Sequence, residues 1–127
     1  MNYLFVLLAI VMISCTRDKG LKSAVECKTT DSVSFSEDLQ PLFNANCTQS
    51  GCHSGEFAVA GLNLEEGKSY AELLNSKSGY VDTINPRISV LYAQMNSVSN
   101  PMPPNGKLPD CKLKLVYNWM LQGAKNN

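Results

Sequence analysis

The sequence has 127 residues, of which 44% are hydrophobic and 17% charged, a composition typical of a globular chain rather than a disordered one. Eleven Lys and Arg balance eleven Asp and Glu, and this formal net charge of zero argues against nucleic-acid binding through a basic surface. The single histidine, His53, excludes within one chain a zinc site with two or three histidines and a haem held by two.

An uncharged apolar run, Tyr3–Ile13, precedes a cysteine near the N-terminus. The run is too short to span a bilayer comfortably and is typical of the hydrophobic region of a signal peptide. It ends at Ile13-Ser14-Cys15, which resembles the lipobox of a bacterial lipoprotein. We therefore predict that residues 1–14 are a signal peptide and that Cys15 is acylated. The alternative is an uncleaved N-terminal anchor.

Polar residues 15–33 follow and predict a lipid-anchored linker, with Cys27 inside it. The folded domain is then expected to span residues 34–127. Both interpretations of the N-terminus tether this domain to a membrane and place it outside the cytoplasm, on the periplasmic side of a bacterial cell envelope.

The first helix of the domain is predicted from a capping box, in which Ser34 caps the helix and Glu37 reaches back to it. Apolar residues then recur at helical spacing, at Leu39, Leu42 and Phe43. Pro41 predicts a kink or local irregularity, because proline cannot donate a backbone hydrogen bond. The helix should end at residues 44–46.

Two short helices are expected in the middle of the domain. Residues 54–68 contain three glycines and predict a loop. A helix at 69–74 should bury Tyr70, Leu73 and Leu74, and after a connection at 75–87 a second helix at 89–95 should bury Val90, Leu91 and Met95.

The C-terminal part combines a proline-rich loop with the last helix. Residues 97–109 hold four prolines and can be neither helix nor central strand. The last helix should start at Asp110 as its cap, bury Leu113, Val116, Trp119 and Met120, and end at Gly123. No segment alternates with period two, so the predicted class is all-α. Such long loops in a small domain favour a bound group that completes the core.

The sequence from Cys47 to His53 places two thiols and an imidazole within seven residues. Covalent haem attachment needs this arrangement, because two thiols add to the two vinyl groups of the porphyrin and the following histidine becomes the proximal iron ligand. The spacing is Cys-x4-Cys-His, two residues longer than usual, so the extra residues must bulge outward, and Ser50 and Gly51 suit that. The alternative is a zinc or disulfide cluster in which Cys47, Cys52 and His53 are joined by Cys27 or Cys111.

With no second histidine, the sixth ligand of a low-spin haem iron has to be a methionine. Met95 and Met120 lie on apolar faces of predicted helices, where core packing is the default interpretation. Met102 lies between prolines, which fix the backbone before a ligand binds. We therefore predict Met102 as the distal ligand.

Taken together, these motifs resemble a small monohaem c-type cytochrome domain of the class I fold, of the bacterial envelope lipoprotein type. The similarity covers residues 34–124 and rests on Gln40-Pro-Leu-Phe-Asn-Ala-Asn-Cys47, Cys52-His53, Leu91-Tyr92, Met102-Pro-Pro104 and Trp119-x-x-x-Gly-Ala124. It implies one covalent haem c, held by Cys47, Cys52, His53 and Met102. It also implies that the first and last helices cross near one haem edge, where Phe43 and Trp119 would pack.

The resemblance accounts for all five cysteines. Cys15 would be acylated and Cys47 and Cys52 would form thioethers, which would leave Cys27 and Cys111 to form a disulfide in an exported chain.

The expected function is that of an electron carrier rather than an enzyme, passing single electrons between redox proteins of the cell envelope. Two alternatives stay open: a haem enzyme or sensor with an open sixth site, and a structural envelope module held by zinc or a disulfide.

Replacing the predicted lipidation site tests the anchor. Cys15→Ser should prevent acylation and move the protein out of the membrane fraction, as mass spectrometry and cell fractionation would show. A wild-type chain without lipid and with its N-terminus uncleaved would favour the uncleaved anchor.

Overall fold

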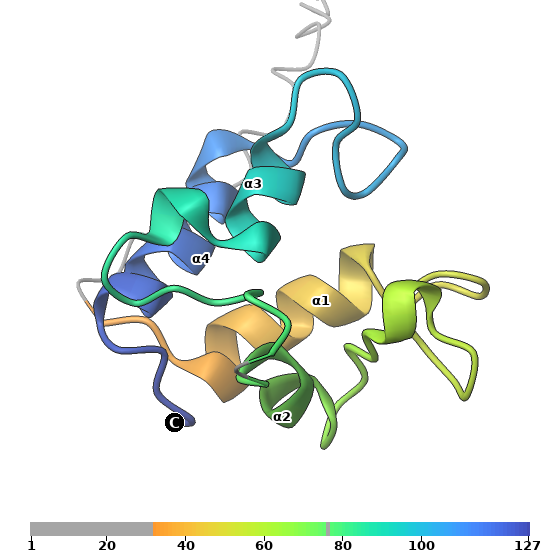
Figure 1. Cartoon of the computed structure of the whole chain (residues 1–127), viewed down its shortest axis with the longest axis horizontal. Helices are drawn as coiled ribbons and strands as arrows, with labels where there is room; N and C mark the ends of the chain where they lie inside the picture. The colour runs from red at the N-terminus through yellow and green to blue at the C-terminus, as the bar shows by residue number, and fades with distance from the viewer. Residues whose placement is uncertain (1–31, 76) are drawn as a thin grey trace, which may run out of the picture.

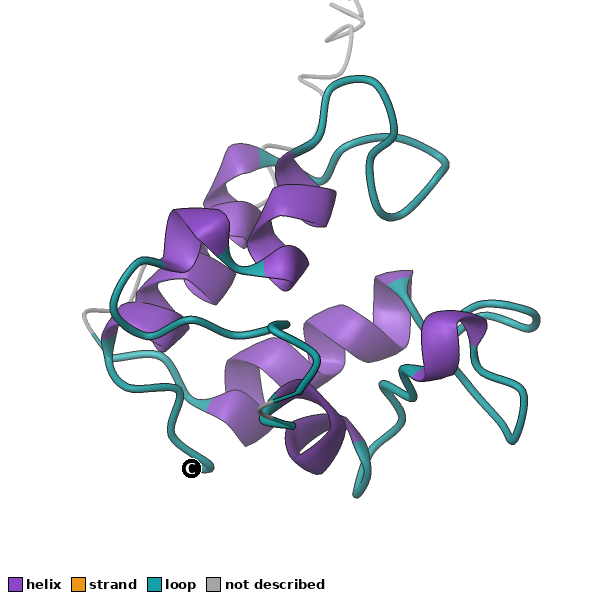
Figure 2. Cartoon of the chain, in the orientation of Figure 1, coloured by secondary structure: helices purple, strands orange, loops and turns teal. Residues whose placement is uncertain are grey.

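The structure, a computed structural model, describes residues 32–75 and 77–127. Within these residues the chain is helical and has no strand, which confirms the predicted all-α class (Figure 2). The α-helices are α1 (Gln40–Asn46), α2 (Ser69–Leu73), α3 (Val90–Asn96) and α4 (Asp110–Leu121), joined by long loops. The predicted signal peptide, the predicted lipidation site Cys15 and most of the predicted linker, including Cys27, lie outside the described residues.

The N-terminal cap of the first helix differs from the predicted capping box. The Ser34 Oγ accepts a hydrogen bond from the Glu37 N–H at 3.2 Å, as expected. The Ser34 N–H, however, donates to the Asp38 carboxylate at 2.8 Å, so the predicted role of Glu37 is wrong. The reason is that the first turn, η1 (Phe35–Leu39), is π-helical. In this wider turn, the carboxylate that accepts from the Ser34 N–H belongs to the next residue along the chain, Asp38 instead of Glu37.

The irregularity expected near Pro41 is confirmed. The π-helical turn ends immediately before α1, and Pro41 lies in the first turn of α1, at the junction of the two helical forms. The regular helix then continues to Asn46, in agreement with the predicted end.

The two middle helices form close to the predicted positions. In α2, Leu73 is buried and Tyr70 and Leu74 are half-buried against the core. In α3, Leu91 and Met95 are buried as predicted, but Val90 is 39% exposed, so its assignment to the buried face is wrong. Val90 is the first residue of the helix, and its side chain lies against a cavity rather than against packed side chains.

The last helix starts at Asp110 as predicted, but Asp110 does not cap it. Pro109, in extended conformation, holds the cap position, and no side chain caps the helix there. The exposed Asp110 carboxylate instead pairs with the Lys107 ammonium at 3.3 Å. Residues 97–109 contain neither helix nor strand, as expected from their prolines.

The rest of α4 follows the prediction. Its four apolar residues Leu113, Val116, Trp119 and Met120 are all buried. Gly123 ends the helix with φ +90°, a conformation that favours glycine, and its N–H donates to the Met120 carbonyl at 3.0 Å.

The two ends of the domain meet in an aromatic cluster made of Phe35, Phe43, Tyr70 and Trp119. The Phe35 ring lies 5.3 Å from Trp119 and 5.2 Å from Tyr70, measured between centroids. Figure 1 shows the C-terminal tail returning to the start of the domain, where the Ser36 N–H donates to the Asn127 carbonyl at 2.9 Å. These contacts hold the first and last helices together at one side of the fold.

Two substitutions at helix starts test the observed caps. The Ser89 Oγ accepts from the Tyr92 N–H at the start of α3 and donates to the buried Pro86 carbonyl at 2.6 Å. Ser89→Ala should therefore lower the free energy of unfolding by about 2 kcal/mol. Asp110→Ala should cost about 0.5 kcal/mol or less, because its ion pair is exposed. Urea unfolding of both variants measures the difference, and equal losses would contradict the assigned caps.

Candidate functional site

An apolar cavity of about 260 Å³ lies between the end of α1 and helix α3. This volume is far larger than a single water needs, so the cavity has room for a sizeable ligand. In Figure 1, α3 lies above α1. The lining side chains are Cys47, His53, Val59, Ala60, Leu62, Leu64, Tyr80, Val90, Leu91, Gln94, Met95 and Met102.

A second cavity of about 190 Å³ adjoins the first on the side of the Cys-His motif. The two cavities share four lining residues, Cys47, His53, Val59 and Met102. The second is also lined by Cys52 and by Pro103 and Pro104. The structure therefore brings together all four predicted site residues, Cys47, Cys52, His53 and Met102, although Met102 is distant from the others in sequence.

The Cys-His motif forms a closed backbone loop directly after α1. The Cys47 N–H still donates to Phe43 within the helix at 2.8 Å, and the His53 N–H returns to the Cys47 carbonyl at 3.0 Å. The extra residues of the long spacer bulge outward as expected: Ser50 and Gly51 are exposed, and Gly51 has φ +78°. The spacer thus lengthens the loop without separating Cys47 from His53.

The His53 ring is oriented by a backbone carbonyl. Its Nδ1 lies 3.1 Å from the Leu62 carbonyl oxygen. Because a carbonyl can only accept, Nδ1 carries the proton and donates it. The neutral ring then has its lone pair on Nε2, which is available to bind a metal ion.

The two motif cysteines are free thiols and half-buried. Burial, with a smaller contribution from Cys52, raises the pKa of the Cys47 thiol to about 11. Cys47 is therefore protonated at neutral pH in the protein without a bound group. Among the described residues, no three His, Cys, Asp or Glu side chains converge closely enough to hold a metal ion.

The three candidate methionines have different surroundings. Met102 is half-buried on the proline-rich loop, and its N–H donates to the Gln94 carbonyl of α3 at 3.0 Å. Met95 is only 4% exposed, yet it also lines the cavity, which its assignment to core packing did not anticipate. Met120 is fully buried in the hydrophobic core.

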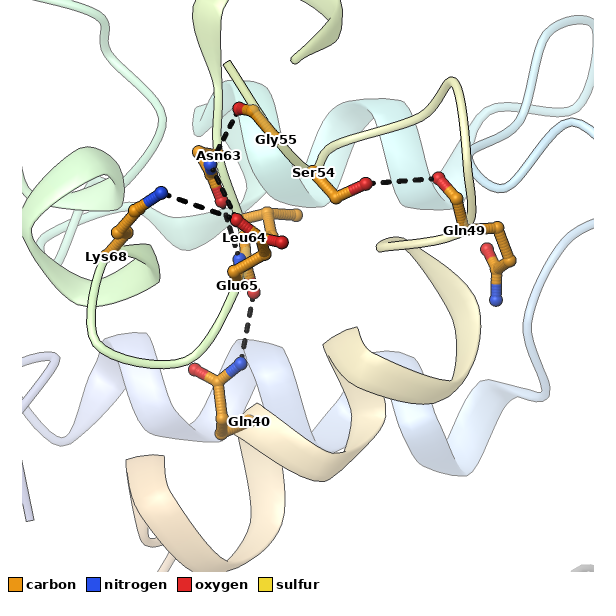
Figure 3. Close-up of polar contacts among 8 residues, drawn as sticks. All are labelled: Gln40, Gln49, Ser54, Gly55, Asn63, Leu64, Glu65 and Lys68. Atoms are coloured by element: carbon orange, nitrogen blue, oxygen red, sulfur yellow. Dashed lines mark hydrogen bonds and ion pairs between the residues drawn. The ribbon is translucent and has the colours of Figure 1, made fainter. Parts of the chain in front are cut away.

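A polar cluster beside the cavity was not found from the sequence. It consists of Asn63, Glu65 and the Gly55 carbonyl, with Gln40 of α1 bonded to the neighbouring Leu64 carbonyl at 3.0 Å (Figure 3). Asn63 is only 7% exposed and lies between two buried leucines. The alternation Leu62-Asn63-Leu64 is the signal that could have identified it, because a buried amide requires polar partners.

One cysteine of the predicted disulfide lies within the described residues and the other lies outside them. Cys111, at the start of α4, is disulfide-bonded. Cys27 is not among the described residues, so the pairing of Cys27 with Cys111 stays a prediction.

No described helix combines the length and the apolar character needed to cross a membrane. Comparison of the chain with protein-family models, with curated proteins and with solved structures finds no match.

Proposed function

We propose that this chain is a monohaem c-type cytochrome with a class I cytochrome c-like fold. It acts as a membrane-tethered electron carrier of the bacterial cell envelope and passes single electrons between envelope redox proteins. One observation carries the proposal: two thiols, an imidazole with its Nε2 available and a methionine all line adjoining cavities in an apolar part of the fold.

The residues present fit a covalent haem. Cys47 and Cys52 are free and would form the two thioether bonds to the vinyl groups. His53 would bind the iron through Nε2, and the Met102 sulfur would be the second protein ligand of the iron. The haem supplies the reversible one-electron couple between ferrous and ferric iron.

The side chains that line the cavity are mostly apolar. Leu62, Leu64 and Leu91 are buried and present hydrocarbon to the cavity. An apolar surrounding stabilises the less charged ferrous state of the site and raises the reduction potential. The chain thereby tunes the potential, and the backbone carbonyl of Leu62 fixes the orientation of His53.

The arrangement of the helices supports the class I fold. The first helical turn contacts α4, and Phe43 and Trp119, which the resemblance assigned to the crossing of the terminal helices, are both fully buried. Phe35 joins them, with its ring 6.2 Å from Phe43 and 5.3 Å from Trp119.

The zinc-stapled module is the weaker hypothesis for the described residues. The motif cysteines and His53 form no ligand group there. Cys111, one of the two cysteines that could have completed such a group, is already in a disulfide.

Haem attachment is the first test. Haem should stay with the purified wild-type polypeptide through denaturation and acid–acetone extraction, because thioether bonds survive both treatments. The double variant Cys47→Ala/Cys52→Ala should release it. Absorption spectra of the extracted protein provide the measurement, and stoichiometric zinc with no haem would favour the structural module.

The sixth ligand is the second test, because it separates an electron carrier from a haem enzyme or sensor. A thioether favours ferrous iron. Met102→Ala should therefore abolish the weak sulfur-to-iron charge-transfer band of the oxidised protein, lower the reduction potential and open the iron to carbon monoxide.

Met120→Ala and Met95→Ala are the matched controls. Met120 is buried away from the cavity, so its replacement should lower the free energy of unfolding by about 2–5 kcal/mol and keep the band. Loss of the band in Met95→Ala but not in Met102→Ala would transfer the ligand role to Met95. A wild type that has no such band and readily binds carbon monoxide would support the haem enzyme or sensor.

A further inference from the structure

We infer that Asn63 and Glu65 are positioning residues for His53: they hold the Leu62 carbonyl against the imidazole and thereby set the strength of the Nδ1–H hydrogen bond. The consequence for a haem iron rests on the proposed function. The contacts themselves are made between residues of the chain and need no bound haem.

The first step is that the segment after the motif folds back onto it. The Val59 N–H donates to the Cys52 carbonyl at 3.0 Å, and the Leu64 N–H donates to the His53 carbonyl at 2.8 Å. With the bond from the His53 ring to the Leu62 carbonyl, three contacts join residues 59–64 to the motif. The position of Leu62 therefore depends on what fixes this returning segment.

The second step is the polar cluster that fixes the segment. Asn63 is the neighbour of Leu62, and its Nδ2 donates to the Gly55 carbonyl at 2.9 Å and to the Glu65 carboxylate at 3.0 Å. Its Oδ1 accepts from the Glu65 N–H at 2.9 Å. Figure 3 shows the Asn63 side chain between the Gly55 carbonyl and the Glu65 carboxylate. The Asn63 amide thus bridges the outgoing and returning parts of the loop.

Glu65 is held in its charged form by the same contacts. The Asn63 amide, followed by the Gly55 backbone N–H, keeps the pKa of the Glu65 carboxyl below its ordinary value. Lys68 also approaches the carboxylate, at 3.5 Å, but on the exposed side. An ionised acceptor strengthens the hydrogen bond from Asn63 and so restrains the amide beside Leu62.

The third step is the attachment of the segment to α1 and α2. The Gln40 amide of α1 donates to the Leu64 carbonyl at 3.0 Å, and its oxygen accepts a hydrogen bond from the Ser69 hydroxyl of α2. Leu62 and Leu64 line the cavity on either side of Asn63. The side chains of the returning segment therefore face the cavity while its polar groups are held by α1 and by the loop.

The chemical consequence concerns the electron density on the ring. A carbonyl that accepts from Nδ1–H makes the imidazole more basic, which favours ferric over ferrous iron. Loosening the Leu62 carbonyl should weaken this effect and raise the reduction potential. A residue with a purely structural role would lower stability and leave the potential unchanged.

The experiment uses the full chain as purified, labelled with ¹⁵N, in its reduced state. The sequence has one histidine, so the ring signals need no further assignment. Asn63→Ala should speed solvent exchange of the Nδ1–H proton about tenfold, as expected for the loss of one restraining hydrogen bond, and raise the reduction potential. Where Asn63→Ala fails to fold, Glu65→Ala makes the test, since the Glu65 side chain is 42% exposed.

Three further variants make the result specific. Glu65→Gln keeps an oxygen that can accept from Asn63 but loses the charge, so its exchange rate should lie between those of the wild type and Glu65→Ala. Lys68→Ala removes only the exposed ion pair. Tyr70→Phe removes a hydrogen bond to the Ala124 carbonyl, 3.0 Å long, in which no residue of the loop takes part, so it serves as a control for the loss of one hydrogen bond. Both of these last variants should exchange as the wild type does.

The outcomes separate the two proposals. The positioning role would be overturned if Asn63→Ala or Glu65→Ala had the same Nδ1–H exchange rate and reduction potential as Tyr70→Phe. The cytochrome assignment would then still stand. A wild type purified without haem would overturn the cytochrome assignment. The exchange rate of the ring proton would then still decide the positioning role, because the bond to Leu62 belongs to the chain itself.

Discussion

The hydrogen bond from the His53 ring to the Leu62 carbonyl is the contact on which the proposed site depends. The chain has one histidine, and this bond determines which of its nitrogens is available to a metal. A carbonyl from the main chain has no rotamers, so its position is set by the path of the backbone. The loop of residues 54–65 is therefore part of the site, even though none of its side chains is a proposed ligand.

Local signals explain why most of the fold could be predicted from the sequence. Pro41 and Gly123 act within one helical turn, and both had the expected effect. The errors arose where a competing local choice was equally compatible with the sequence. The π-helical turn gave Asp38 the role predicted for Glu37, and Pro109 took the cap position predicted for Asp110.

The four residues proposed to bind haem could be singled out from the sequence because their chemistry limits the choices, and their haem binding stays a prediction. Two thiols followed by the only histidine leave few alternatives, and methionine was the remaining ligand type. The contacts that support these residues could not be predicted in the same way, because they join segments that lie side by side only after the chain has folded. Leu62 is an ordinary apolar residue in the sequence, and only the fold brings its carbonyl to the imidazole. Val90 was misassigned for a related reason, since helical periodicity does not distinguish a packed core from a cavity wall.

The cavity also bears on how so small a domain holds together. The aromatic contact of Phe35 with Trp119 joins the first and last helices at one side. At the other side, the end of α1 and helix α3 face each other across apolar walls, and the bond from the Met102 N–H to Gln94 is what ties the proline-rich loop to α3. Apolar side chains that line a cavity lack contacts on that side, whereas protein interiors are otherwise closely packed. A covalently held planar group would supply those contacts, and under the proposed function the same group would also carry the electron.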